Sequence, residues 1–170
     1  SIPGISGRFD ANLLKDASLL GTVTKKYTPG WHQDSRGWWY ADSFSSYYAA
    51  RWAKIGDKWY YFDSNGEMQT GWVLDNMYYC GTDGAMRTGW QKLFPPDSDY
   101  DPDRMSPGDE GDDGKHWYYF SDSGKKYMPK DTSGDYGTYK IDGVAYCFDS
   151  DGALQTGWKN VGVDNADYDI

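Results

Sequence analysis

Residues 51–72 read R-W-A-K-I-G-D-K-W-Y-Y-F-D-S-N-G-E-M-Q-T-G-W, and residues 71–90 repeat the pattern as G-W-V-L-D-N-M-Y-Y-C-G-T-D-G-A-M-R-T-G-W. In W-Y-Y-F, successive side chains alternate between two faces, which indicates a β-strand with both faces occupied. The Gly56-Asp57 pair before it is typical of a two-residue hairpin connection, and the D-S-N-G after it is typical of a tight turn. Each unit of about 20 residues is therefore predicted to be one β-hairpin followed by a return loop.

The unit recurs along the chain at a constant distance from its closing G-W. Counting back thirteen positions from Trp52, Trp72, Trp90 and Trp158 reaches, in turn, Trp39, Trp59, Met77 and Ala145. A further unit, K-H-W-Y-Y-F-S-D-S-G-K-K around Trp117, keeps only the first half of the pattern. An isolated hairpin is marginally stable in water, so successive hairpins are expected to stack on each other. We therefore predict an all-β fold, a solenoid of stacked β-hairpin repeats.

The composition agrees with such an array. The chain has 170 residues, of which 9 are Trp, 16 are Tyr and 21 are Gly, and its mean hydropathy is -0.85. Because aliphatic residues are sparse, aromatic rings must supply most of the burial. The many Gly, Asp and Ser residues indicate frequent tight turns rather than long helices.

The charge balance limits the classes of partner. The formal net charge is -9 and the isoelectric point is about 4.5, which excludes a nucleic-acid partner and suits a cationic ligand. No apolar run approaches the roughly 20 residues of a membrane span, and the first residues do not resemble a signal peptide. We therefore expect no membrane insertion, and a chain that is a mature product or an excised fragment.

The repeated motifs carry a family resemblance. The combination of G-W, W-Y-Y-F-D and G-x-M-x-T-G-W resembles the cell-wall-binding repeat of choline-binding modules, and related repeats occur in glucan-binding and clostridial toxin domains. Residues 28–72 are most similar to the modules of pneumococcal and phage lysins, because P-G-W-H-Q-D-S-R-G-W-W-Y followed by S-S-Y-Y mirrors their long first repeat. The resemblance implies a secreted, non-catalytic module that binds choline on the teichoic acids of a Gram-positive cell wall. Any catalytic domain would be attached outside this chain.

The resemblance also implies where the ligand is held. It lies between consecutive hairpins, in a cage of two aromatic residues from one hairpin and one from the next, with a Met or Leu nearby. A quaternary ammonium cannot donate a conventional hydrogen bond, so methyl burial and the negative faces of aromatic rings must recognise it. Carried over by position, the first cage uses Trp31, Trp39 and Trp59, and all three positions are aromatic.

The later cages are expected to be weaker. The second would use Trp52 and Trp59 with Met68 alongside, and Tyr78 would compensate for Met77. In the third cage, Trp72 would face Trp117. In the fourth cage, Trp90 and Trp117 would face Ala145, which has no ring. Binding capacity is therefore expected mainly in the N-terminal half. The predicted ligand-binding residues are Trp31, Trp39, Trp52, Trp59, Met68, Trp72, Tyr78, Trp90 and Trp117.

Other interpretations of the same rings stay open. Aromatic residues at period-two spacing often serve packing alone. We predict this for Tyr60, Tyr61, Phe62, Tyr118, Tyr119, Phe120 and Phe148. Stacking of sugar C–H faces on Trp would use the same surfaces as choline, which makes a glycan-binding module an alternative. A structural spacer or adhesin stalk with decayed sites is a second alternative.

Two segments fall outside the repeat pattern. Residues 1–29 are predicted to be a linker or a short helical segment, and residues 30–170 the repeat array, interrupted by an acidic loop at 95–114. Within this loop, carboxylates have the spacing of a calcium loop at Asp99, Asp101, Asp103 and Glu110. Arg104 stands where such loops need Gly, so a solvated acidic loop is favoured and no metal is expected.

Catalytic chemistry has little support in the sequence. The only two histidines, His32 and His116, lie in separate hairpin motifs, and no nucleophile elbow, zinc triad or phosphate loop is present. Cys80 occupies the Phe position of its hairpin and Cys147 the second Tyr position, so both are predicted to be packing residues. We predict no enzymatic activity and no cofactor.

Overall fold

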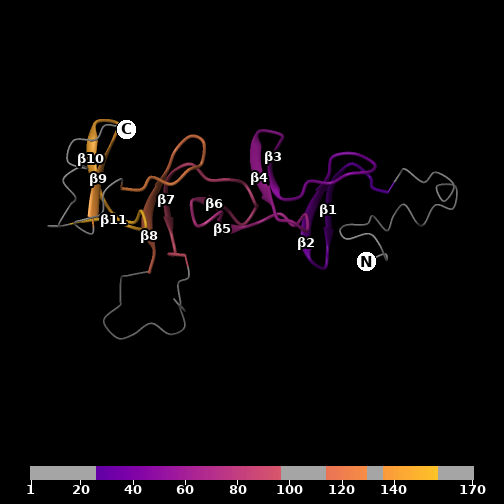
Figure 1. The fold of residues 1–170 in the computed structure, drawn as a ribbon, viewed down its shortest axis with the longest axis horizontal. Helices are drawn as coiled ribbons and strands as arrows, with labels where there is room; N and C mark the ends of the chain where they lie inside the picture. The colour runs from indigo at the N-terminus through magenta and orange to yellow at the C-terminus, as the bar shows by residue number, and fades with distance from the viewer. Residues whose placement is uncertain (1–25, 97–113, 130–135, 157–170) are drawn as a thin grey trace. The chain divides into compact units, whose positions relative to one another are not determined.

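The computed structural model describes residues 26–96, 114–129 and 136–156 (Figure 1). Within these residues every regular element is a β-strand, which confirms the predicted all-β class. The strands are β1 (Gly30–Asp34), β2 (Gly37–Ala41), β3 (Arg51–Ile55), β4 (Lys58–Phe62), β5 (Gly71–Val73), β6 (Tyr78–Cys80), β7 (Gly89–Leu93), β8 (His116–Phe120), β9 (Tyr136–Ile141), β10 (Val144–Asp149) and β11 (Leu154–Gln155). The winding of the hairpins into a solenoid stays a prediction.

The strands pair as the repeat pattern predicts. β1 pairs with β2, β3 with β4, β5 with β6 and β7 with β8, while β9, β10 and β11 form a three-stranded sheet with β10 in the centre. In the second hairpin Ile55 pairs with Lys58, so Gly56 and Asp57 form the predicted two-residue connection. Gly56 has a φ of 66°, a left-handed conformation that glycine adopts without strain. The unit of one hairpin and one return loop is therefore confirmed.

The described chain divides into two compact units. The first holds residues 26–73 and 79–86, and the second holds residues 74–78 together with the described residues from 87 onward. Each unit has a core of its own. The first core contains Tyr27, Trp39 and Ala41, and the second contains Tyr139, Ile141 and Phe148. Phe62, Phe120 and Phe148 are fully buried, which confirms that these rings serve packing.

Each hairpin is followed by a return loop that folds back to pair with a residue at the end of its second strand, or with the residue before the end in β10. The pairs are Ala41 with Tyr47, Phe62 with Met68, Cys80 with Met86, Phe120 with Lys126 and Phe148 with Leu154. We call the second residue of each pair the return-loop position. It lies six residues after the strand residue in every repeat, so these positions are structurally equivalent.

Several sequence predictions fall wholly or partly outside the described residues. They concern the N-terminal helical segment, the four carboxylates of the acidic loop and Trp158. Neither of the two cysteines, both of which are described, forms a disulfide bond, and Cys80 is buried in the Phe position as predicted. Within the described residues, no cluster of His, Cys, Asp or Glu could hold a metal ion, and no helix has the length and apolarity to cross a membrane.

Candidate ligand-binding groove

A groove of about 350 Å³ lies in the first unit, between its hairpins and the turn at Thr82 and Asp83. Three of its walls are aromatic rings, carried by β1, β2 and β4. We call it the first groove, and its lining residues are Trp31, Trp38, Tyr60, Met68, Thr82 and Asp83. Residues from two successive hairpins and from two return loops therefore meet at one place.

The ring of Trp31 stands nearly perpendicular to each of the other two rings. The ring centroids of Trp31 and Trp38 are 6.3 Å apart with an interplanar angle of 84°. Those of Trp31 and Tyr60 are 5.0 Å apart at 74°. Rings in this arrangement form the sides of a box instead of a stack, and they present both faces and edges to its interior. Such a box suits a compact cation with an apolar surface.

Met68 is held in place on two sides. Its backbone N–H donates to the carbonyl oxygen of Trp38 at 2.7 Å. Gly84 closes over its side chain, since a Cβ at this glycine would lie only 2.2 Å from the Met68 Sδ atom. Gly84 also has a φ of 82°, which favours glycine independently of the contact. The turn at residues 81–84 therefore fixes both the thioether and the polar edge of the groove.

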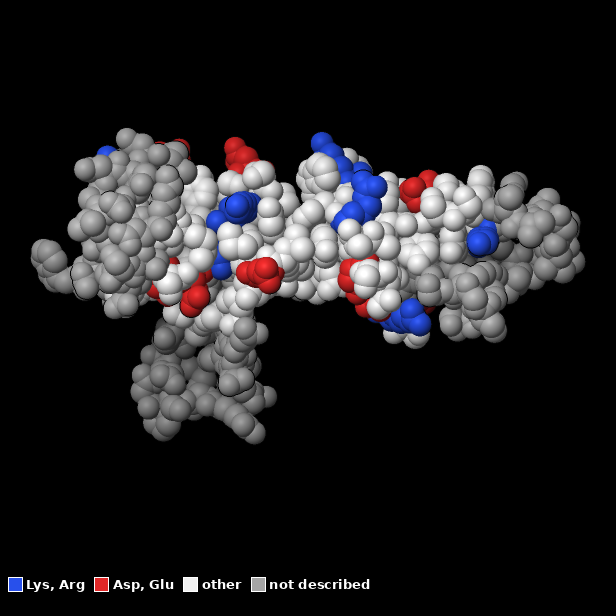
Figure 2. Space-filling view, viewed as in Figure 1, with Lys and Arg blue, Asp and Glu red and all other residues white. Residues whose placement is uncertain are grey.

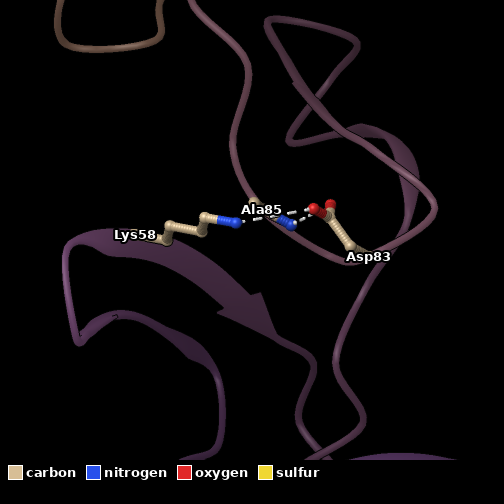
Figure 3. Close-up of polar contacts among 3 residues, drawn as sticks. All are labelled: Lys58, Asp83 and Ala85. Carbon is tan, nitrogen blue, oxygen red and sulfur yellow. Dashed lines mark hydrogen bonds and ion pairs between the residues drawn. The ribbon is translucent and has the colours of Figure 1, made fainter.

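Asp83 gives this edge a negative charge. One carboxylate oxygen accepts a hydrogen bond from the Ala85 N–H at 2.9 Å, and the other lies 3.9 Å from the Lys58 Nζ atom (Figure 3). Both charged side chains are about half exposed, so the ion pair adds little stability. The cationic side chains Arg51, Lys54 and Lys58 are all exposed on the β3–β4 hairpin, and Figure 2 shows Lys and Arg gathered there.

The rings that line the first groove differ from those predicted for the first cage. Trp31 lies in the first groove as expected. Trp39 is only 2% exposed, stacks on His32 at 4.3 Å and belongs to the core, whereas its neighbour Trp38 is 42% exposed and lines the groove. Trp59 does not line the groove either, and its place as the third ring is taken by Tyr60.

The physical reason is a difference in loop length. The return loop at residues 42–50 is one residue longer than the loop at residues 63–70, so a fixed count back from the next G-W reaches the wrong face of β2. In the strand pairing, Gln33 faces Trp38 as Lys54 faces Trp59. Trp38 is thus the structural equivalent of Trp59, and Trp39 is the structural equivalent of Tyr60.

Comparison with known families agrees with this arrangement of hairpins and rings. Residues 49–88 match the choline-binding repeat family, and residues 112–126 match the cell wall binding repeat family. The chain contains choline-binding repeats. Repeats of this kind form binding modules and not catalytic domains. A comparison with curated protein sequences gives no significant match.

Two solved structures are similar to these choline-binding repeats. CbpJ from Streptococcus pneumoniae TIGR4 is 27% identical with a TM-score of 0.57, over 81% of this chain and 39% of CbpJ. CbpF, solved in complex with ipratropium, is 31% identical with a TM-score of 0.53, over 76% of this chain and 34% of CbpF. CbpF is choline binding protein F from Streptococcus pneumoniae. The chain therefore spans about a third to two fifths of the length of these structures.

A second set of rings in the second unit repeats the geometry of the first groove. Trp90 lies 5.0 Å from Tyr146 at 64°, which matches the contact between Trp31 and Tyr60. The prediction placed Ala145 opposite Trp90, but Ala145 is exposed and Tyr146 makes the contact. In both repeats the ring that contacts the tryptophan of the preceding hairpin is one residue after the predicted position, Tyr60 after Trp59 and Tyr146 after Ala145. Leu154 occupies the return-loop position here.

The remaining predicted residues lie on separate hairpins of the choline-binding repeats. Met68, predicted for the second cage, lines the first groove instead. Trp52 packs against Tyr61 at 5.2 Å, Trp72 packs against Tyr79 at 5.3 Å, and Tyr78 begins β6. Trp117 on β8 is exposed, as are Trp38 and Trp59 at the equivalent positions of β2 and β4. The structure does not bring these residues together into a single described site.

The second unit contains a smaller and more polar hollow of about 260 Å³. It is lined by Asn76, Pro95, Pro96, His116, Tyr118, Asp149, Asp151 and Ala153. Burial raises the pKa of Tyr118 to about 12, with smaller contributions from the carboxylates of Asp149 and Asp151. These groups are not part of the first groove, and the sequence-based prediction did not include them as a site.

The raised pKa of Tyr118 predicts a loss of stability at alkaline pH. The unfolded chain releases this proton near pH 10, so the folded chain binds more protons between about pH 10 and 12 and the free energy of unfolding falls there. Tyr118→Phe should reduce this fall by roughly 1 kcal/mol at pH 11, measured by urea unfolding at pH 9 and pH 11. Burial lowers the pKa of Lys126, which acts in the opposite direction, so the test compares the variant with the wild type. Equal slopes would contradict the prediction.

Proposed function

We propose that the chain anchors its parent protein to the bacterial cell wall by binding the choline groups of teichoic acids in the first groove. The observation that carries this proposal is the groove walled by three rings, with Trp31 nearly perpendicular to Trp38 and to Tyr60, and lined also by a methionine and a carboxylate. The matches to choline-binding and cell wall binding repeats support the same class of ligand. The parent protein would be secreted, with any catalytic activity in another domain.

The chemistry of the groove distinguishes choline from a sugar. The trimethylammonium group gains from methyl burial and from cation–π attraction of about 0.5–2 kcal/mol at a ring face. The carboxylate of Asp83 attracts a positive charge, whereas a neutral glycan could use it only as an acceptor of hydroxyl hydrogen bonds. Sugar stacking on an exposed Trp needs no such charge. The groove therefore favours choline over the glycan alternative.

The rings of the second unit form a second proposed choline site. Trp90 and Tyr146 have the geometry of Trp31 and Tyr60, and Trp117 is exposed at the position equivalent to Trp38. Leu154 would replace the methionine of the first groove. Two sites of this kind within one chain would strengthen attachment to a polymer that carries many choline groups, through multivalent binding.

Removal of Trp38 tests the first groove. Trp38→Ala should weaken choline binding at that groove by about tenfold or more, because one of the three rings is lost. Isothermal titration should then show one fewer site of the original affinity, and Trp38→Ala combined with Trp117→Ala should abolish the remaining binding. Phe44→Ala is the matched control, since Phe44 is similarly exposed but does not line the groove. Retention of the chain on a glucan column together with no response to millimolar choline would overturn the proposal in favour of a glycan.

A further inference from the structure

Within the part of the chain that the structure describes, Lys126 is the buried charged side chain, with an exposed fraction of 5%. It occupies the return-loop position of its repeat, where the first groove has Met68. The backbone confirms this equivalence, since the Lys126 N–H donates to the carbonyl oxygen of Met77 at 2.8 Å, as the Met68 N–H does to that of Trp38. A cation therefore stands at the position where the first groove has a thioether.

The ammonium group of Lys126 lies over an aromatic ring that is equivalent to a wall of the first groove. Its Nζ atom is 5.5 Å from the ring centroid of Tyr118, within the range of a cation–π interaction. Tyr118 pairs with Gln91 in β7 as Tyr60 pairs with Ala53 in β3. Tyr118 is fully buried, whereas Tyr60 is only partly buried and lines an open groove. The ring face is thus covered where the lysine is present.

The following turn also repeats the arrangement around Met68. A Cβ at Gly152 would lie 2.9 Å from the Tyr127 backbone oxygen, 3.0 Å from the Met128 Sδ atom and 3.2 Å from the Lys126 Cδ atom, so this glycine also lies against the side chain at the return-loop position. Asp151 precedes Gly152 as Asp83 precedes Gly84. Asp151 and Asp149 both interact electrostatically with the ammonium group, favouring its charged form against the cost of burial. Ring, cation and carboxylate are therefore assembled within one chain.

We propose that Lys126 is a built-in cation that fills the ring-and-carboxylate site of its repeat and so closes this repeat to choline. The identity of the excluded ligand rests on the proposed function of the first groove. Because the lysine is tethered, it competes at a high effective concentration and is present whether or not choline is available. An ammonium group also donates hydrogen bonds to carboxylates, which choline cannot do. The array thus has sites that are open to choline and one site that its own lysine fills.

Nuclear magnetic resonance tests the placement of the cation without any ligand. The ε-methylene protons of Lys126 should be shifted upfield by the ring current of Tyr118, and Tyr118→Leu should remove the shift. Lys125, which is exposed on the same loop, should show ordinary shifts and serves as the internal control. Ordinary shifts for Lys126 in the wild type would overturn the proposal, even if the first groove binds choline.

Choline titration tests whether Lys126 closes its repeat to choline. Lys126→Met, combined with Met77→Trp to supply the ring found at Trp38, should add one choline site per chain to the wild-type number. Lys126→Arg with Met77→Trp keeps a cation and should add none, and Lys125→Met should leave the number unchanged. If the wild type binds choline and the first variant gains no site, Lys126 does not close the repeat. If the wild type binds no choline, the proposed function fails, and the methylene shifts alone decide whether the lysine fills its site.

Discussion

Trp39→Ala is expected to lower the free energy of unfolding by about 3–5 kcal/mol, the usual cost of removing a large ring from a core. Trp39 is almost fully buried, packs edge to face with Tyr27 at 5.5 Å and also contacts Tyr47 at 6.1 Å. Few apolar residues surround this small core, so its neighbours cannot readily collapse into the cavity. Urea unfolding followed by circular dichroism measures the change.

The adjacent residue provides the control for this prediction. Trp38→Ala removes the same side chain from the opposite face of β2, where it is 42% exposed, and should cost less than about 1 kcal/mol. The two variants should also differ in binding, because Trp38→Ala weakens choline binding at the first groove while the protein stays folded. Equal losses of stability, or a larger loss for Trp38→Ala, would show that the faces of β2 are assigned incorrectly.

The hairpins could be predicted from the sequence because their signals are local. The Gly56-Asp57 connection and the Asp-rich turns depend on residues next to one another, and period-two alternation follows from the geometry of a strand. The turn at Asp63 illustrates this. Its carboxylate oxygen accepts hydrogen bonds from the N–H groups of Asn65 and Glu67, both at 2.9 Å, which is a short-range property of an Asp at the start of a turn.

Of the rings that line the first groove, Trp31 was predicted at its own position and the other two only to within one position. Trp38 and Trp39 are both tryptophan, so residue type could not indicate which of them faces the groove. That choice depends on the pairing register of β1 with β2, and a one-residue change of register exchanges the two faces. Tyr60 was missed for a different reason, because it was predicted to serve packing beside the more conspicuous Trp59.

Lys126 had a signal in the sequence that a search for aromatic residues does not use. In the return loops, G-E-M, G-A-M and G-A-L correspond to G-K-K at residues 124–126, so a lysine replaces an apolar residue at one repeat position. Its burial and its location over Tyr118 could not be predicted, because they depend on how the loop and the following turn pack around it.

Gly84→Ala is expected to reduce both stability and choline binding. An alanine here has a strained positive φ of 82°, and its Cβ would meet three atoms of the Met68 side chain within 2.8 Å. We expect a loss of about 2–3 kcal/mol in the free energy of unfolding, from the sum of backbone strain and overpacking. Because Met68 must move into or away from the first groove, choline affinity should fall by about tenfold.

Two comparisons separate the contributions of strain and contact. Gly71→Ala imposes a similar strain at a φ of 78° but meets no atom within 4 Å, so it should cost only about 1 kcal/mol and leave choline binding unchanged. Met68→Ala in the Gly84→Ala background removes the overlapping side chain and should recover the part of the stability that the contact costs, without restoring affinity. If Gly84→Ala and Gly71→Ala behave alike in unfolding and in titration, the turn does not hold Met68, because strain alone would then account for both.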